Sequence, residues 1–368
     1  MVSVFRYGIS AWDCLVSKHN ILWLLESSGT TYIMKGRSLL GMAKTDIFEP
    51  RTKLKPYEYS DFLDYKDAIR NSYWVHTEFN FSGDVQDFKV NTSDVEQSVI
   101  RKTMLAISQI EVSVKTFWAE IYEDMPKAEI GSVGMTFAES EVRHMDAYSH
   151  LLDILGISED FEEVTEVPAM KKRIDYLDDY LEGARGDDRQ EYVKSVMLFS
   201  TFVEHVSLFS QFLIMTSFDK YEKKFKGISN AVEATSKEEQ IHGLFGVELV
   251  NTIREENPDL FDEEFEEEVQ EACMRAYEAE QDILDWIFSE GELDFLPREY
   301  IDEFLKDRFN QSLENVDVDP IFDVDEEKLE ETRWFDEDIM MTKDNDFFSK
   351  RSTTYNKNTK SVTAGDMF

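Results

Sequence analysis

Cysteine is almost absent from this chain of 368 residues, which contains only Cys14 and Cys273. Two cysteines cannot build a disulfide framework or a zinc site made of thiolates, and they favour a reducing, cytoplasmic environment. Glycine and proline are also scarce, with 15 and 7 residues, which argues against a fold made of many short strands and turns. The sequence is therefore expected to form a helical protein.

Basic residues are few in comparison with acidic ones, 39 against 77, so the formal net charge is −38. A chain with this charge is repelled by nucleic-acid phosphates and by anionic lipid headgroups. No stretch reaches the roughly 18 uninterrupted apolar residues that a membrane span needs. We therefore expect neither nucleic acid nor a membrane as a partner.

Apolar residues recur at intervals of three and four from Ser98 to about Arg308, which is the pattern of amphipathic helices. Prolines in this span fall only between the segments, where helices begin or end. The predicted helices are 94–123, 130–155, 169–182, 188–217, 228–256, 262–291 and 298–314. Several are longer than the usual mean of about 11–12 residues, which favours an all-α bundle.

The chain outside the bundle divides by composition. We interpret residues 1–41, which have a small excess of basic residues, as an extension of undefined structure, with Met42 as an alternative start. The predicted divisions are then an N-terminal arm at 42–97, the bundle at 98–315, an irregular segment at 316–350 and a polar, flexible tail at 351–368.

Two of the six histidines end a Glu-x-x-His motif, Glu141–His144 and Glu239–His242. Each motif lies in the middle of an otherwise apolar, core-facing helix stripe. A single such motif is more often an exposed pair. Because a buried carboxylate without a partner costs several kcal/mol, these residues are expected to bind metal or to be strongly paired.

Two more helices carry one glutamate each in an apolar row, Glu111 and Glu204. The order of a single glutamate followed by a Glu-x-x-His motif therefore occurs twice. Four carboxylates and two imidazoles from four helices form the ligand set of ferritin-like di-iron and di-manganese proteins. We predict two transition-metal ions per chain, with iron favoured and manganese or a mixed pair left open. The predicted ligands are Glu111, Glu141, His144, Glu204, Glu239 and His242.

Tyr148 lies one helical turn beyond His144 on the same stripe, so its ring is expected near the metal pair. A tyrosine inside a helix is usually part of the core. Beside an oxygen-activating site, however, a phenol can also lose an electron and a proton and become a radical.

The segment AESEVRHMDAYSHLL at 138–152 resembles the signature of class I ribonucleotide reductase small subunits, the beta or radical-generating subunits. The resemblance covers most of residues 60–315. It implies a ribonucleoside-diphosphate reductase that makes deoxyribonucleotides, a homodimer, the six metal ligands above, and Tyr148 or the metal pair as the holder of the radical. It also implies a large (alpha) subunit as partner, bound through the C-terminal tail.

The same resemblance assigns a path for radical transfer. Trp74 and Glu238 match the family's tryptophan and its acidic partner, and Tyr355 matches a mobile tyrosine in the docking tail that ends at Phe368. The sequence departs from the family at the first ligand, where Glu111 replaces the usual aspartate at a spacing one residue shorter. Glu238 also replaces an aspartate. The longer first ligand leaves the metal pair open.

Two other functions compete with this one. The Glu-x-Arg-His form of Glu141–His144 also occurs in di-metal oxygenases and desaturases, which act on small apolar substrates. That reading requires an apolar channel to the metals and leaves Trp74 without a role. A ferritin-like metal-storage protein is the third possibility, although such chains are usually much shorter.

Overall fold

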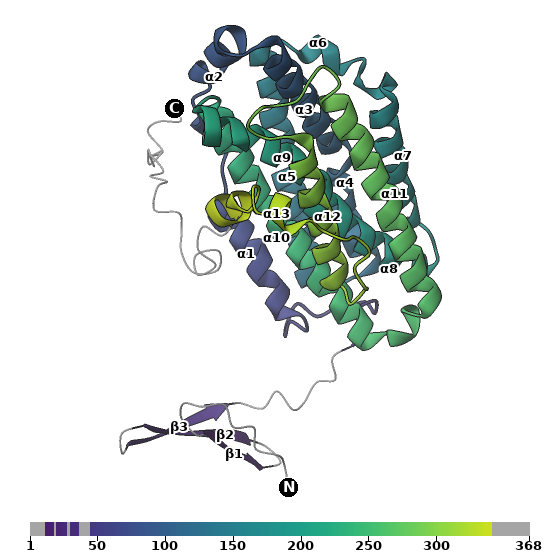
Figure 1. The fold of residues 1–368 in the computed structure, drawn as a ribbon. Coiled ribbons are helices and arrows are strands. Elements are labelled where there is room, and N and C mark those ends of the chain that lie inside the picture. The colour runs from purple at the N-terminus through teal and green to yellow at the C-terminus, as the bar shows by residue number, and fades with distance from the viewer. Residues whose placement is uncertain (1–11, 18–19, 28–29, 37–44, 341–368) are drawn as a thin grey trace, which may run out of the picture. The chain divides into compact units, whose positions relative to one another are not determined.

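The computed structural model describes residues 12–17, 20–27, 30–36 and 45–340, and the chain divides into two units, Met1–Asp46 and Ile47–Phe368. The first unit contains three antiparallel strands in the order β1-β2-β3 (Figure 1). Their bounds are Trp12–Ser17, Asn20–Ser27 and Thr30–Gly36. This sheet is not among the elements expected from the sequence. The threonines, tyrosine and isoleucine at the start of β3 favour a strand, but so short a pattern is ambiguous without its pairing partners.

The second unit is a bundle of long helices that lie side by side (Figure 1). The long elements are α3 (Asp94–Ser113), α4 (Lys115–Asp124), α5 (Ala128–Leu155), α7 (Pro168–Gly183), α8 (Arg189–Leu198), η5 (Phe199–Ser207), α9 (Phe209–Ser217), α10 (Lys226–Glu256), α11 (Glu263–Ile287) and α12 (Arg298–Glu314). The remaining elements are η1 (Ser60–Phe62), α1 (Leu63–Ser72), η2 (His76–Glu78), α2 (Ser82–Gln86), η3 (Asp87–Asn91), α6 (Ser158–Phe161), η4 (Val164–Glu166), η6 (Phe218–Glu222), η7 (Pro258–Leu260), α13 (Glu326–Leu329) and η8 (Phe335–Met340). The all-α bundle predicted from the sequence is confirmed.

Local chemistry sets the ends of several helices. Ser93 and Glu96 form a capping box at the start of α3, in which each side chain accepts from the other's backbone N–H. Asp262 caps α11 by accepting from the Phe265 N–H. Gly156 ends α5 in the left-handed conformation, at a φ of 75°.

Two helices differ from the predicted ones in a way that matters for the site. The predicted helix at 94–123 is interrupted at Val114, between α3 and α4. The predicted helix at 188–217 is continuous, but its middle is the π-helix η5 and it extends to Glu222. Periodicity in sequence does not reveal the π-helix, because every residue of η5 is buried and no exposed polar face marks the turn of the helix.

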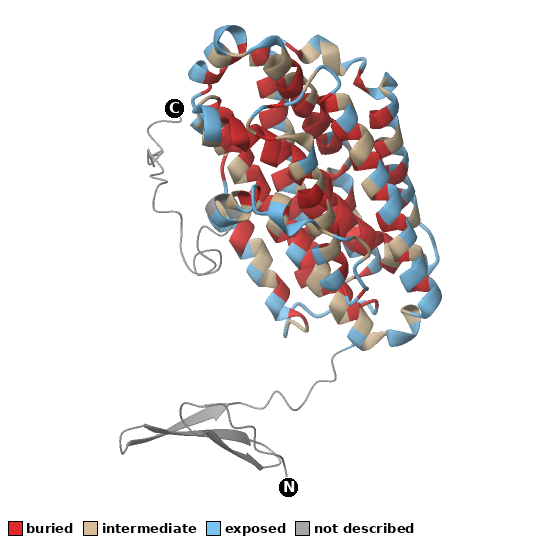
Figure 2. Ribbon diagram, in the orientation of Figure 1, coloured by how far each residue is buried: buried red, intermediate tan, exposed pale blue. Residues whose placement is uncertain are grey.

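The centre of the bundle is buried and rich in aromatic residues. Trp118, Phe137 and Phe245 contact one another, with ring centroids 5.2–5.7 Å apart. The helical stretch Arg189–Glu222 is long and apolar enough to cross a membrane, but the apolar window is completely buried within the bundle. Figure 2 shows the same division, with buried residues on the inner faces of the helices and exposed ones outside.

Candidate metal centre

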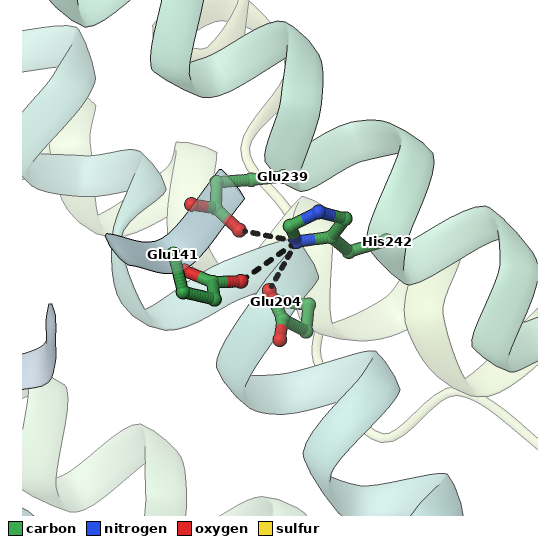
Figure 3. Close-up of side chains that lie close together, drawn as sticks. All are labelled: Glu141, Glu204, Glu239 and His242. Carbon is green, nitrogen blue, oxygen red and sulfur yellow. Dashed lines mark hydrogen bonds and ion pairs between the residues drawn. The ribbon is translucent and has the colours of Figure 1, made fainter. Parts of the chain in front are cut away.

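The six predicted ligands meet in the middle of the bundle. Within each of two groups, one potential ligand atom per residue lies within 4.8 Å of the others. The first group is Glu141, Glu204, Glu239 and His242 (Figure 3), and the second is Glu111, Glu141 and His144. Glu141 belongs to both groups, and all six residues are at most 1% exposed. The arrangement therefore offers two adjacent positions for metal ions that share one carboxylate.

Helix geometry places these side chains. The two Glu-x-x-His pairs lie on α5 and α10, where residues three apart share a face. Glu111 lies in the last turn of α3, just before the interruption at Val114. Glu204 lies in the π-helix η5, an irregularity that often occurs at functional sites. The Trp118 indole N–H donates to Glu204 Oε1 at 2.6 Å and orients that carboxylate.

Both imidazoles turn Nδ1 toward the carboxylates. Nδ1 of His242 is 2.9 Å from Glu141 Oε1 and 3.1 Å from Glu239 Oε2 (Figure 3). Nδ1 of His144 is 2.8 Å from Glu239 Oε1. The opposite nitrogens contact outer groups, since Nε2 of His242 is 3.0 Å from Ser140 Oγ and Nε2 of His144 is 2.8 Å from Glu238 Oε2. Metal-bound histidines are typically oriented by such outer contacts.

The unpaired atoms of the cluster test whether it suits metal ions. Both oxygens of Glu111 and of Glu141, Oε1 of Glu239 and Nδ1 of His144 are buried without a partner in hydrogen-bond geometry. Buried polar atoms of a folded protein are nearly always paired, so a group of unpaired donors at one place indicates a missing ligand. Carboxylate oxygens and imidazole nitrogens suit iron or manganese, and the residues present therefore fit a di-metal centre.

The electrostatics of the cluster agree with this fit. Burial raises the pKa of Glu111 and of Glu204 well above the usual carboxylate range. Burial alone would lower the pKa of His144, but Glu239 and other carboxylates raise it well above its usual value. Burial acts in the same way on His242, where Glu141 is the leading carboxylate that raises the pKa. The cluster without metal therefore holds protons that metal ions would have to displace.

Tyr148 lies where the sequence placed it, on α5 and 1% exposed. Burial raises the pKa of its phenol, and the charge of Glu111 raises it further. Its hydroxyl has no partner in hydrogen-bond geometry. Tyr148 is therefore a buried phenol close enough to the cluster for the charge of Glu111 to act on it. Its role in redox chemistry is a prediction.

Trp74 and Glu238 are joined to the cluster through His144. The Trp74 indole N–H donates to Glu238 Oε2 at 3.1 Å, and the same oxygen contacts His144 Nε2. The Trp74 and His144 rings are also stacked, with centroids 5.7 Å apart. Tyr355 and the predicted docking tail lie outside the described residues.

Sequence reasoning missed Arg143 as a member of this network. Its Nη1 and Nη2 donate to the two oxygens of Glu238 at 3.1 and 3.2 Å, and Nη1 also donates to the Trp74 carbonyl at 3.0 Å. The signal available in the sequence was the position of Arg143 beside His144. The sequence shows that Arg143 belongs to the Glu-x-Arg-His motif. It does not show which groups the guanidinium contacts, because these groups are distant in sequence.

Comparison with known proteins identifies the family. A sequence model described as ribonucleotide reductase, small chain, matches residues 51–330. The chain belongs to this family. A probable ribonucleoside-diphosphate reductase small subunit of Invertebrate iridescent virus 3 is 23% identical over 322 residues, which is 83% of this chain and 85% of that protein. The predicted membership among ribonucleotide reductase small chains is confirmed.

Solved structures show the small-chain fold. The ribonucleotide reductase R2 subunit from Clostridium botulinum has a TM-score of 0.70 at 18% identity, over 80% of this chain and 98% of that one. An R2-like ligand-binding oxidase with a Mn/Fe cofactor has a TM-score of 0.60 at 19% identity, over 69% of this chain and 92% of that one. At these identities the comparison shows the ferritin-like fold that this chain shares with both proteins.

Proposed function

We propose that the chain is the radical-generating subunit of a ribonucleoside-diphosphate reductase. It would bind two transition-metal ions and deliver an oxidising equivalent to a large subunit, which reduces ribonucleotides. The observation that carries the proposal is the convergence of six buried ligand residues, four of which have atoms without a hydrogen-bond partner. Four carboxylates in the apolar core of a bundle destabilise the fold unless a bound cation compensates for their charge.

We assign the ligands of the two metal ions from the two groups. Glu111 and His144 would bind one metal ion, Glu204 and His242 the other, and Glu141 would contribute to both. Glu239 would complete the set, since its two oxygens face the two different imidazoles. The bound metals supply one-electron redox chemistry with oxygen. The protein fixes the ligands and excludes water from the site.

Tyr148 is the side chain that we propose to be oxidised. Loss of one electron from a buried phenol is accompanied by loss of its proton, because a phenol cation is a very strong acid. Glu111 is the cluster carboxylate whose charge acts most strongly on Tyr148, so the proton would leave toward the metal site. The apolar surroundings would then protect the resulting radical from water and reductants.

Glu238 would couple the site to Trp74. Its Oε2 accepts from the indole N–H and contacts His144 Nε2, so one atom links the two rings. It can therefore hold the indole proton when Trp74 is oxidised and return it afterwards. We further propose a cytoplasmic homodimer, with Tyr355 and residues 351–368 forming the contact with the large subunit.

The test compares two buried phenols. Tyr148→Phe and the control Tyr192→Phe each remove a buried phenol hydroxyl, but only the pKa of Tyr148 responds to charges of the cluster. After loading with iron or manganese and exposure to oxygen, all three proteins should bind about two metals per chain, by analogy with other ferritin-like di-metal bundles. Wild type and Tyr192→Phe should show a tyrosyl signal in electron paramagnetic resonance. A tyrosyl signal that persists in Tyr148→Phe would exclude this tyrosine.

A second function is favoured by one observation. The fold is also that of an R2-like ligand-binding oxidase, and Arg143 gives the motif a form that occurs in oxygenases. If the chain oxidises a small apolar molecule, mass spectrometry of the loaded protein should reveal a bound or oxygenated compound. Ribonucleotide reduction with a large subunit would instead be absent.

A further inference from the structure

An exposed tyrosine stands directly beside the buried Trp74. Helix α1 ends at Ser72, and the chain passes through Tyr73 with a ψ of 127°, away from helical geometry. Trp74 is 5% exposed, whereas Tyr73 is 39% exposed. A partner protein therefore has no direct access to the Trp74 ring, but it can contact Tyr73.

Arg143 connects the two rings. Its guanidinium carbon is 4.6 Å from the centroid of Tyr73 and 5.9 Å from the centroid of Trp74. The centroids of the two rings are therefore no farther apart than the sum of these distances. Arg143 is itself held in place by Glu238 and by the Trp74 carbonyl, so both rings are fixed on the same cation.

We propose that Tyr73 is a relay residue that carries the oxidising equivalent from Trp74 to the protein surface, with Arg143 as its positioning residue. The inference rests on the function proposed above. Oxidised Trp74 takes one electron from Tyr73, and its indole nitrogen regains any proton held by Glu238. The phenolic proton of Tyr73 passes to water. The Tyr73 radical then takes one electron and one proton from the next phenol or thiol, which restores the tyrosine.

The charge of Arg143 suits this step. A fixed cation close to both rings disfavours a second positive charge on either of them. It therefore favours oxidation in which the proton leaves together with the electron, as it does when a partly exposed phenol gives a neutral radical. The same guanidinium keeps Glu238 Oε2 on the indole N–H, because its two donors fix both carboxylate oxygens.

The experiment uses four variants of the full chain. Tyr73→Phe removes only the hydroxyl and keeps the ring on Arg143, whereas Tyr73→Trp restores a ring that can be oxidised. Tyr122→Phe is the matched control, because Tyr122 is 41% exposed and lies on α4. Trp74→Phe gives the radical transfer and the turnover that remain when the path through Trp74 is blocked.

The first measurement needs no metal. Azide radicals made by pulse radiolysis oxidise tryptophan, and the decay of the tryptophan radical into a tyrosyl radical is followed by absorbance. The part of this transfer that is lost in Trp74→Phe should also be lost in Tyr73→Phe and should be kept in Tyr122→Phe. Transfer that is unchanged in Tyr73→Phe would overturn the proposal.

The second measurement uses the metal-loaded protein with its large subunit. Tyr73→Phe should form the oxidised site normally, yet its turnover should fall to the level of Trp74→Phe, and Tyr73→Trp should retain more activity than Tyr73→Phe. Equal activity of Tyr73→Phe and wild type would refute the relay, as would equal activity of the Phe and Trp variants. Failure of wild type to form an oxidised site would refute the proposed function instead, and the two failures are thus distinguishable.

Discussion

Replacing Glu111 with methionine should stabilise the metal-free protein. Glu111 is completely buried, and neither of its oxygens has a hydrogen-bond partner. An unsatisfied buried polar group costs about 1–3 kcal/mol, and methionine has a similar volume without that cost. We therefore expect the free energy of unfolding of the metal-free bundle to rise by about 1–3 kcal/mol. Sites built for function commonly destabilise the fold in this way.

Glu280 provides the matched control because it is equally buried but fully paired. It accepts from Arg173 at 3.0 and 2.6 Å and from the Tyr176 hydroxyl at 3.0 Å. Glu280→Met leaves the Arg173 cation buried without its partner and should cost about 3–5 kcal/mol. The two substitutions, identical in chemistry, should therefore change stability in opposite directions.

The assay is urea denaturation with a chelator present, followed by helical circular dichroism. In a second series with added metal, wild type should gain stability through binding to the folded state, and Glu111→Met should lose most of that gain. The reasoning is refuted if Glu111→Met destabilises the metal-free protein as Glu280→Met does. Such a result would mean that Glu111 has a structural partner in the fold.

Three further outcomes are expected. The pKa values of Glu111, His144, Glu204 and His242 are raised in the metal-free protein, so each of these residues binds protons more tightly in the folded state than in the unfolded state, whereas the pKa of Glu239 is lowered. The stabilising effect of these four residues is present at low pH and is lost as pH rises through the raised values. Metal affinity should rise with pH, as titration calorimetry with proton counting can show. Trp118→Phe removes the donor to Glu204 and should weaken metal binding about 10- to 100-fold in equilibrium dialysis, whereas an unchanged affinity would exclude an orienting role. Deletion of residues 351–368 should leave the metal content intact but abolish turnover with the large subunit, and a truncated protein that keeps full turnover would show that the tail is dispensable.

The sequence predicted the helices and the cluster for the same physical reason. A charged residue in an apolar helix stripe is conspicuous, because the stripe itself shows which face is buried. Glu111 and Glu204 could be found in this way, and so could both Glu-x-x-His pairs. Trp74 and Glu238 followed only from the family resemblance, since nothing in their local pattern indicates that they are in contact.

Other features could not be predicted because they depend on contacts between distant segments. The role of Arg143 comes from contacts with Trp74, just beyond α1, and with Glu238 on α10, which lie 69 and 95 residues away in sequence. The π-helix that carries Glu204 is buried on all sides, so no exposed polar face shows its different period. The β1–β3 sheet lies in residues whose composition gave only weak strand signals.

We propose that this chain holds two redox-active metal ions and uses them to generate and store an oxidising equivalent. Elemental analysis combined with electron paramagnetic resonance tests it directly, on full-length protein loaded with iron or manganese and exposed to oxygen. The account predicts about two metals per chain, as in other ferritin-like di-metal bundles, together with a persistent tyrosyl or coupled high-valent metal signal. Two bound metals without any persistent oxidised species would contradict a radical-generating role and favour an oxidase.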